Sequence, residues 1–317
     1  MMLNFNFAEI KVCFRRGNVR PRYLSLSRES FSRKTEELHK RLKSCGLCGN
    51  RCGVNRIEGV KGRCGAGVNM KVSSVQAHFG EETPLVGRSG SGTIFLSNCP
   101  MKCVYCQNWR ISQKGVGTEK TEEEVAELML DLQERGCHNV NWVTPTHYVP
   151  QLVKSLRIAK EGGFETPVVY NTGGYDDPEV IELLDGIVDI YMPDVKYGSD
   201  KKGEKYSNVG NYWDVVRKNL KEMHNQVGDL KVDGEGIARR GLLVRHLVLP
   251  NGIAGTEKVL RFIARDISQD SYVNIMDQYY PRYRAEEYDG LRRKVKRKEV
   301  EDAKQRAREL GLHRGFQ

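Results

Sequence analysis

The chain has 317 residues and a formal net charge of +10, with 39% hydrophobic and 29% charged residues. This composition is that of a globular protein and excludes a disordered one. No apolar run reaches the roughly 18 residues that a transmembrane helix needs, so we expect no membrane partner. The length is about that of two average domains, but single barrels of about 200–250 residues are common, and we expect one large domain with appendages.

The basic excess lies at the two ends of the chain. Lys and Arg outnumber Asp and Glu in residues 1–44 and 282–317, whereas the region between them is close to neutral. Basic ends fit a nucleic-acid footprint, but solvated helix faces carry such charge more often, so nucleic acid is not the expected partner. Residues 1–26 form a basic extension. Their Arg- and Ser-containing composition is that of an organellar transit peptide, and the alternative is that they are an irregular or extended start of the chain.

Residues 28–43 are predicted to form a helix. Phe31, Leu38 and Leu42 are spaced for one apolar stripe, and Ser27 or Ser30 can cap the first turn. This helix leads directly into a cysteine-rich segment.

Four cysteines follow at Cys45, Cys48, Cys52 and Cys64, among glycines that let the backbone bend tightly. A C-x2-C knuckle followed by two further cysteines predicts a closed four-thiolate site, for which zinc and an auxiliary [4Fe-4S] cluster fit equally. Seven of the nine cysteines lie in this group or the next one. Such clustering predicts metal ligation in a reducing compartment, hence a cytoplasmic protein or, with a transit peptide, an organellar one.

Residues 68–92 are predicted to be a short strand followed by a loop. His78, Glu81 and Glu82 in this stretch are candidates to face a site, with a structural role as the alternative. The glycine-rich run at 87–92 enters a strand and not a helix, so it is not a phosphate-binding loop.

The stretch from Ser97 to Trp109 carries Cys99, Cys103 and Cys106 at C-x3-C-x2-C spacing, just after a strand-like run. An iron–sulfur cluster usually has four thiolates. A cluster held by three keeps one iron open to an outside ligand, as a catalytic zinc keeps one position open. A zinc loop or a ferredoxin-like site is the alternative, although ferredoxins use C-x2-C-x2-C spacing.

From residue 93 onward, short β-rich runs alternate with helical runs, which predicts an α/β fold with a parallel sheet or barrel. The expected strands are 93–97, 139–144, 167–171, 187–192, 242–249 and 272–276, and the expected helices between them are 121–135, 148–161, 178–184, 211–227 and 256–267. Six such units predict a partial (β/α)6 TIM-like barrel over residues 93–281. The cysteine-rich segment of residues 27–92 precedes it, a basic helical tail at 282–317 follows it, and residues 228–241 are expected to form a hairpin.

Polar residues follow the expected strands, at the edge where parallel sheets bind ligands. The second strand leads into Thr144 and the third into Asn171, while the fourth leads into Asp194 and Lys196. Arg245 lies inside an apolar run, and a buried charge needs a partner. We therefore expect Arg245 to face an anionic ligand group, with a structural carboxylate such as Asp194 as the alternative.

Six motifs resemble those of the pyruvate formate-lyase activating enzyme-like branch of the radical S-adenosylmethionine (SAM) superfamily. They are CPMKCVYCQNW, VTPTHYVPQ, VYNTGGY, DIYMPDVKY, VRHLVLPNG and VNIMDQYYP. The resemblance extends from about residue 21 to 281 and is closest to a subfamily with an amino-terminal cysteine group. In this superfamily the open iron chelates the amino and carboxylate groups of SAM, and an electron from the cluster cleaves the sulfonium to give a 5′-deoxyadenosyl radical.

The resemblance implies that Cys99, Cys103 and Cys106 bind the [4Fe-4S] cluster and that the backbone at Tyr105 faces the adenine of SAM. The stretch from Thr144 to Thr146 occupies the place where activating enzymes carry a Gly-Gly-Glu that holds the SAM amino group. No catalytic side chain is assigned.

Two further groups of residues are carried over from the family. Lys196 and Arg245 align with polar contacts to SAM. Asn171, Thr172, Met192 and Asp194 align with a monovalent-cation site beside it, although the family's first carboxylate is Asn171 in this chain.

Two classes of function remain open at this point. The first is a radical SAM enzyme that takes an electron from a donor such as flavodoxin or ferredoxin and abstracts hydrogen from a glycine of a partner protein or from another substrate. The second is a non-catalytic metal- or nucleic-acid-binding protein that uses the two cysteine groups and the basic ends. Polar residues at the ends of six strands favour the enzyme, because a binding module has no need of them around one pocket.

Overall fold

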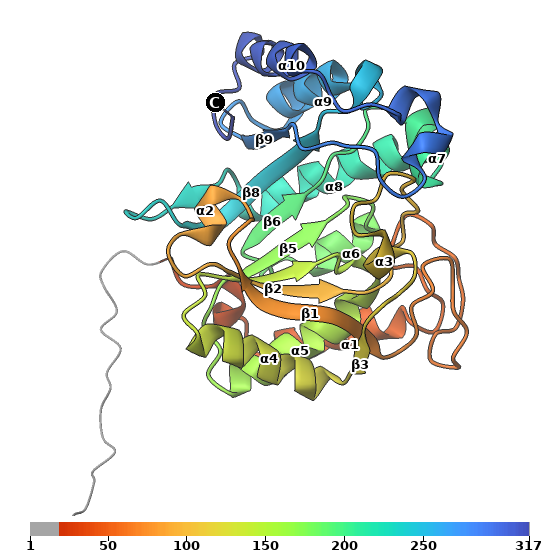
Figure 1. Ribbon diagram of the computed structural model, residues 1–317. Helices are drawn as coiled ribbons and strands as arrows, with labels where there is room; N and C mark the ends of the chain where they lie inside the picture. Colours follow the sequence, from red (N-terminus) through yellow and green to blue (C-terminus); the bar gives the residue numbers. More distant parts are fainter. Residues whose placement is uncertain (1–18, 317) are drawn as a thin grey trace, which may run out of the picture.

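The computed structural model describes residues 19–316, which form an α/β fold (Figure 1). Most of the predicted basic extension, residues 1–18, lies outside the described residues. The remainder packs on the barrel through a 3-10 turn, η1 (Arg22–Ser25). Tyr23 in this turn is completely buried, and its hydroxyl donates to the carbonyl oxygens of Phe164 at 3.2 Å and Thr166 at 3.0 Å.

The described residues form a nine-stranded sheet with the order β3-β1-β2-β4-β5-β6-β8-β7, in which β9 also pairs with β8. Its six parallel strands are β2 (Ser91–Leu96), β4 (Val140–Val143), β5 (Val168–Thr172), β6 (Ile190–Pro193), β8 (Ala238–Leu247) and β9 (Tyr272–Met276). The predicted partial barrel of six parallel strands is confirmed. The sheet does not close, because the free edge of β2 pairs with β1 and not with β9.

The stretch before β2 is more regular than the sequence predicts. β1 (Met70–His78) has nine residues and pairs antiparallel with β2 and with β3 (Thr118–Lys120). The hairpin expected in residues 228–241 is present, since β7 (Lys231–Val232) pairs antiparallel with β8.

Helices cover the outer face of the sheet (Figure 1). They are α1 (Arg28–Lys40), α4 (Glu122–Glu134), α5 (Val149–Glu161), α6 (Pro178–Leu183), α7 (Asp200–Ser207), α8 (Tyr212–Val227), α9 (Thr256–Phe262) and α10 (Arg297–Glu309). Ser27 caps α1, and Thr121 and Glu124 form a capping box on α4, as the sequence predicts. The short helix α7 was not expected, because its charged sequence lacks a clear apolar stripe.

The inner face of the sheet is filled by the segment that joins β1 to β2. Its one-turn helix α2 (Thr83–Val86) carries Leu85, which is completely buried. Leu85 belongs to a separate apolar cluster with Val169, Ile190, Met192, Leu230, Ala238 and Leu243. Because successive side chains of a strand point to opposite faces, these residues lie on the other side of the sheet from the core under the helices.

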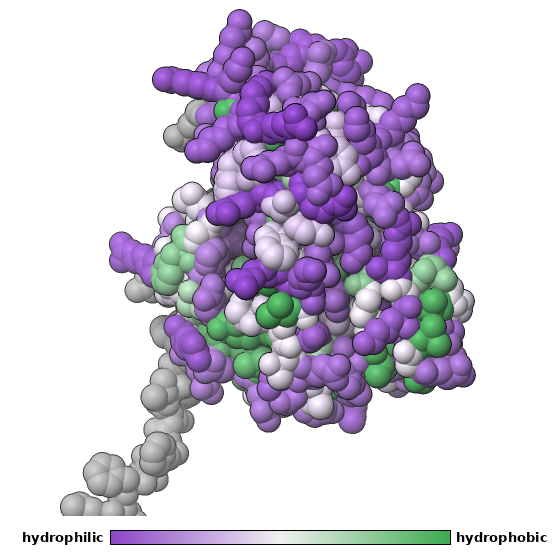
Figure 2. Space-filling view, turned by 45° about the vertical axis from the view of Figure 1, so that its right-hand side comes forward, coloured by the Kyte–Doolittle hydropathy of each residue, from purple (hydrophilic) through white to green (hydrophobic). Residues whose placement is uncertain are grey.

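The surface seen in Figure 2 is mostly hydrophilic. Among the large hydrophobic side chains that are exposed, Ile57 and Val60 lie in the cysteine-rich segment. None of the described helices combines the length and apolar character that crossing a membrane requires.

Replacing Leu85 with Ala tests the packing of the inner face. We expect a loss of about 2–5 kcal/mol in the free energy of unfolding, because the substitution leaves a cavity in a closed apolar cluster. Val116, which is 55% exposed, supplies the control, and Val116→Ala is expected to change stability by less than about 0.5 kcal/mol. Urea unfolding measures both, and equal effects would contradict the assignment of Leu85 to the barrel interior.

Candidate active site

The loop after β2 turns back sharply on itself before it reaches its cysteines. Asn98 adopts a left-handed backbone with φ of 73°, and Gly115 packs against it so closely that a Cβ there would lie 2.7 Å from the Asn98 side-chain oxygen. The Lys102 and Val104 amides donate to backbone oxygens at the end of α7, each at 2.9 Å. The loop is therefore held at its start and in its middle, and α3 (Trp109–Ser112) follows it.

Hydrogen-bond partners surround the sulfurs of this loop. The Sγ of Cys103 lies 2.9 Å from the Ser207 hydroxyl, and the Sγ of Cys106 lies 3.1 Å from the Ser112 hydroxyl. Burial raises the pKa of Cys103 to about 11, although the Lys196 ammonium and Ser207 act against this rise. Hydroxyl donors of this kind stabilise thiolates, so the side chains present fit the ligation of an iron–sulfur cluster.

The three cysteines line one pocket of about 270 Å³ together with the carboxyl ends of the parallel strands. Among the other residues that line it are Met101, Tyr105, Gln107, Ser112, Val143, Thr144, Asn171, Thr172, Gly173, Asp194, Lys196, Arg245, Leu247, Met276 and Gln278. The structure thus brings the C-x3-C-x2-C loop and all but one of the predicted SAM-contacting residues to a single site.

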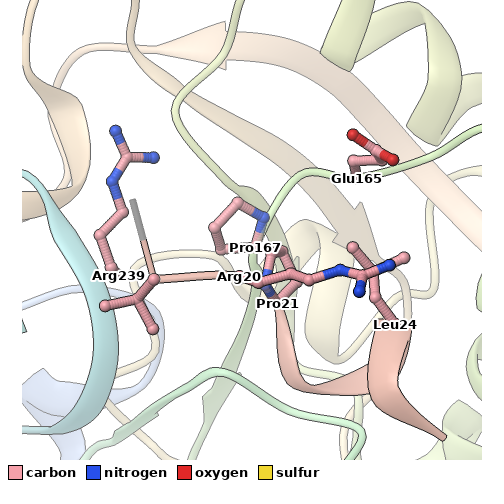
Figure 3. Close-up of a pocket in the computed structure, with 7 residues that line it drawn as sticks. Arg20, Pro21, Leu24, Glu165, Pro167 and Arg239 are labelled. Atoms are coloured by element: carbon pink, nitrogen blue, oxygen red, sulfur yellow. The ribbon is translucent and has the colours of Figure 1, made fainter. Parts of the chain in front are cut away.

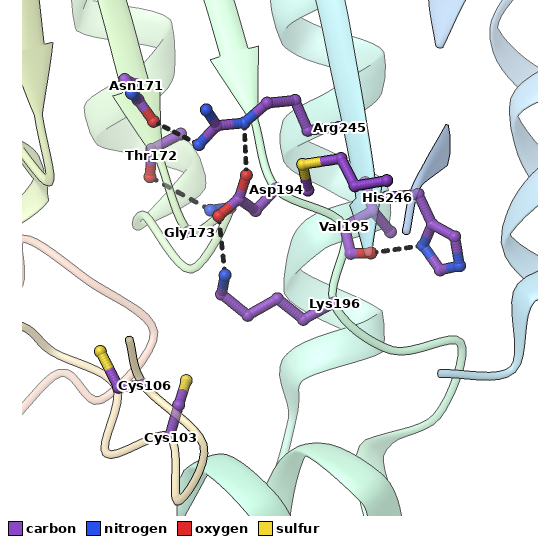
Figure 4. Close-up of polar contacts among 12 residues, drawn as sticks. Cys103, Cys106, Asn171, Thr172, Gly173, Asp194, Val195, Lys196, Arg245 and His246 are labelled. Atoms are coloured by element: carbon purple, nitrogen blue, oxygen red, sulfur yellow. Dashed lines mark hydrogen bonds and ion pairs between the residues drawn. The ribbon is translucent and has the colours of Figure 1, made fainter. Parts of the chain in front are cut away.

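Charged side chains form a network in the wall of this pocket (Figure 4). Arg245 donates from Nε to Asp194 Oδ1 at 2.7 Å and from Nη2 to Asn171 Oδ1 at 2.8 Å. Its Nη1 lies 3.3 Å from Glu81 Oε2, and Lys196 Nζ donates to Asp194 Oδ2 at 2.7 Å. Burial by itself would raise the pKa of Asp194, but the two cations outweigh it and lower that pKa to about 2.

This network bears on two sequence-based predictions. Arg245 has the carboxylate partner Asp194, which was the alternative to a contact with an anionic ligand. The Arg245 guanidinium also bridges Asn171 and Asp194, two members of the predicted cation site, and that site stays a prediction. Met192 belongs to the apolar cluster around Leu85.

Of the two threonines predicted to contact SAM, one lines the pocket and the other does not. Thr144 lines the pocket and has a left-handed backbone with φ of 62°, a strained conformation for a β-branched residue. Thr146 does not line the pocket. It is buried and lies 3.1 Å from the Thr172 hydroxyl, which in turn donates to Asp176.

Tyr105 lines the pocket and is held by two other rings. It packs edge-on against Tyr197, with ring centroids 6.3 Å apart, and against Tyr279 at 5.9 Å. These contacts fix the backbone between Cys103 and Cys106.

The candidates His78, Glu81 and Glu82 differ in their contacts. Glu81 and Glu82 lie between β1 and β2: Glu81 reaches the network through Arg245, and Glu82 accepts a hydrogen bond from Asn274 at 2.6 Å. His78, the last residue of β1, packs edge-on against the ring of Phe95.

A second cavity, of about 360 Å³, lies at the opposite end of the strands (Figure 3). It is lined by Val19, Arg20, Pro21, Leu24, Glu165, Pro167 and Arg239. These residues include no thiol, and the cavity lies where β5 begins and not where parallel strands bind their ligands.

Two residues of the site, Ser207 and Ser112, were not predicted from the sequence. Ser207 is 104 positions from Cys103, and the contact of the predicted candidate Glu81 with Arg245 likewise spans 164 positions. No local pattern connects residues so far apart. Ser112 is six positions from Cys106, and a hydroxyl on the helix that follows a cysteine loop is a signal that could have been used.

No group of three or more His, Cys, Asp or Glu side chains within residues 19–316 is gathered closely enough to hold a metal ion. The same finding applies to Cys99, Cys103 and Cys106 and to the amino-terminal cysteines. The distances between these side chains therefore do not distinguish the two cysteine groups as metal sites.

Comparison with known proteins identifies the family. A family model described as the radical SAM superfamily matches residues 93–234. A protein of Methanocaldococcus jannaschii described as uncharacterised is 34% identical over 321 residues, which cover 98% of this chain and 83% of that protein. The chain belongs to the radical SAM superfamily. Membership implies a [4Fe-4S] cluster and SAM as cofactors.

Radical SAM relatives with named activities are more distant. The pyruvate formate-lyase-activating enzyme of Listeria monocytogenes is 27% identical over 130 residues, which cover 37% of this chain and 51% of that enzyme. Among solved structures, a radical SAM methyltransferase from Sphaerobacter thermophilus aligns with a TM-score of 0.46 and 14% identity, over 71% of this chain and 65% of that one.

Replacing Asp194 with Asn tests the network. We expect the variant to lose about 3–5 kcal/mol of stability at neutral pH, because two largely buried cations lose their shared carboxylate. Since the pKa of Asp194 is lowered from 3.8 to about 2, its contribution is present above pH 3.8 and is lost as the pH falls toward 2. The difference between wild type and variant should therefore shrink across that interval in urea unfolding.

The control for Asp194 is Asp266, an exposed partner of Lys221. Asp266→Asn should change stability by less than about 1 kcal/mol. An Asp194→Asn variant as stable as this control at pH 7 would show that the network does not depend on the carboxylate charge.

Proposed function

We propose that this radical SAM protein reductively cleaves SAM and abstracts a hydrogen atom from a substrate bound above the carboxyl ends of the strands. The observation that carries the proposal is the single pocket shared by Cys99, Cys103, Cys106 and the strand ends. A [4Fe-4S] cluster and SAM, when bound, supply a 5′-deoxyadenosyl radical, with methionine as the other product. The electron comes from a reduced donor such as flavodoxin or ferredoxin, which requires a reducing compartment.

The chain's own residues bind and orient the cofactors in this proposal. The three thiolates hold the cluster, and the hydroxyls of Ser207 and Ser112 donate to two of them. Lys196 is the cation best placed to contact the SAM carboxylate, because Nζ has one protein partner, Asp194 Oδ2, and the side chain lines the pocket. Burial acts to lower the pKa of Lys196, but Asp194 and the Cys103 thiol raise it above its usual value, so the charge is retained.

Arg245 has a different proposed role from Lys196. All three of its guanidinium nitrogens contact protein side chains. It therefore acts as a positioning residue that holds Asp194 and Asn171, and it supplies a fixed positive charge where a monovalent cation was expected.

The proposed substrate is a glycine of a glycyl-radical enzyme, which would make this protein an activating enzyme. The support is the sequence similarity to pyruvate formate-lyase-activating enzyme. Incubating the reduced protein and SAM with a glycyl-radical enzyme should produce a glycyl radical signal by EPR spectroscopy. Production of 5′-deoxyadenosine without that signal would retain SAM cleavage and reject this substrate.

Anaerobic reconstitution with iron and sulfide, followed by reduction in the presence of SAM, should yield 5′-deoxyadenosine. Cys103→Ala should abolish the product, because two thiolates do not hold the cluster. The control is Cys137→Ala, since this buried cysteine belongs to neither group. Chromatography measures the product, and equal yields from wild type and Cys103→Ala would reject the proposed cluster site.

Lys196→Met should weaken SAM binding without loss of iron. A lost charge-assisted hydrogen bond costs about 1.5–3 kcal/mol, which is roughly a 10- to 150-fold higher dissociation constant. Lys102→Met is the matched control, because Lys102 lies in the cysteine loop but is not among the residues that line the pocket. Equilibrium binding of SAM to the reconstituted proteins measures the dissociation constants. An unchanged dissociation constant for Lys196→Met would assign Lys196 to a structural role.

A further inference from the structure

A buried arginine lies within the amino-terminal cysteine-rich segment. Arg56 is 0% exposed. It donates to the Gly67 carbonyl from Nε at 3.1 Å and to the His147 carbonyl from Nη1 at 2.6 Å, and its guanidinium lies 5.6 Å from the ring centre of Tyr148. No carboxylate within residues 19–316 forms an ion pair with Arg56. Its hydrogen bonds are satisfied, but its charge has no anionic side chain as a partner.

A fully buried charge is costly unless an opposite charge compensates it. Backbone hydrogen bonds hold Cys45 beside the turn that carries Arg56: the Cys45 amide donates to the Val54 carbonyl at 2.9 Å, and the Gly53 amide donates to the Cys45 carbonyl at 3.0 Å. His147 also lies nearby but is neutral, since burial lowers its pKa to about 3. The cysteines of this segment, as metal-bound thiolates, are the anions that can compensate the charge of Arg56.

Hydrogen-bond donors are directed at two of the four amino-terminal sulfurs. The Ala66 backbone amide donates to the Sγ of Cys64 at 3.5 Å, and the Asn50 side-chain amide donates to the Sγ of Cys48 at 3.6 Å. Donors to sulfur favour its anionic form, so the surroundings of these two sulfurs fit metal-bound thiolates.

A glycine, Gly62, leaves space for the thiol of Cys52. A Cβ at Gly62 would lie 2.5 Å from the Sγ of Cys52, so a larger residue would displace the sulfur. Contacts within the segment place its cysteines near one another: the Sγ of Cys52 lies 3.9 Å from the Cys45 carbonyl oxygen, and Cys64 follows two residues after Gly62, which packs against Cys52.

We propose that Cys45, Cys48, Cys52 and Cys64 bind one metal centre through four thiolates and that Arg56 is its buried counter-charge. Four thiolates around a zinc ion or a [4Fe-4S] cluster leave the centre with a net negative charge, which the guanidinium offsets. The centre is closed, because four protein ligands leave no position for a substrate. Its role is therefore structural, and it does not depend on the proposed hydrogen abstraction.

The position of this centre connects it to the active-site loops. The Asn50 side chain donates to the Pro100 carbonyl at 3.0 Å, and the Gly49 amide donates to the Tyr175 carbonyl at 3.1 Å. Arg56 holds the His147 carbonyl in the same way. These three partners belong to the loops after β2, β5 and β4, which line the proposed SAM pocket, so a metal centre in this segment would order three walls of that pocket.

The test uses the full chain with Cys99, Cys103 and Cys106 all replaced by Ala, so that the radical SAM cluster cannot form. After anaerobic purification, elemental analysis should find about one zinc or about four irons per chain, and Cys48→Ser should remove them. Metal-free protein titrated with cobalt(II) should develop the intense absorption bands of a tetrahedral thiolate site. If this variant, with Arg56 intact, binds neither zinc, iron nor cobalt, the proposal is overturned.

The counter-charge is tested in the same background. Arg56→Met should weaken zinc binding roughly 10- to 100-fold in a chelator competition, as loss of groups around a metal's ligands typically does. Arg56→Lys keeps the charge and should retain most of the affinity for zinc. It is the variant to measure if Arg56→Met does not fold. Arg51→Met is the control, because Arg51 belongs to the same segment but is 59% exposed and pairs with Asp177. Equal affinities of the Arg56→Met and Arg51→Met variants, or of the Lys and Met variants, would reject Arg56 as the counter-charge.

Discussion

The ion pair between Asp194 and Arg245 is the interaction on which the geometry of the pocket depends. The two residues lie where β6 and β8 diverge, and they also form a backbone bridge, with the Val195 amide donating to the Arg245 carbonyl at 2.8 Å. Neither charge is stable alone in this environment, because the cost of burying an unpaired ion exceeds what one hydrogen bond returns. The pair therefore fixes the relative position of two strand ends and, through Lys196, the direction of a cation that faces the cysteine loop.

The interior of the barrel is divided by this network into two layers. Leu85 and its apolar neighbours fill the layer toward the amino ends of the strands, whereas charged and polar groups fill the layer toward the carboxyl ends. Glu81 connects the layers, since it belongs to the segment that carries Leu85 and contacts Arg245. An apolar floor beneath a polar pocket keeps water from entering from below, which suits chemistry that produces a reactive intermediate.

The cysteine-rich segment and the radical SAM loop depend on the same strand ends. Asn50 and Gly49 contact the loops after β2 and β5, and these loops also present Cys99 and Gly173 to the pocket. A metal centre in the amino-terminal segment would stabilise the fold and the pocket together, because a closed thiolate site contributes folding free energy directly. This explains why a segment that supplies no residue to the pocket lies so close to it.

The sequence alone determined the local features of this protein. Alternating β and helical runs, the caps at Ser27 and Thr121, and the C-x3-C-x2-C loop depend on neighbouring residues, and all of them were predictable. The partners of Arg245 and the lack of a carboxylate partner for Arg56 within residues 19–316 were decided only by the tertiary structure. The physical reason is that strand order and register bring together residues separated by 51 and 164 positions, as for Arg245 with Asp194 and with Glu81, and no local pattern encodes that proximity.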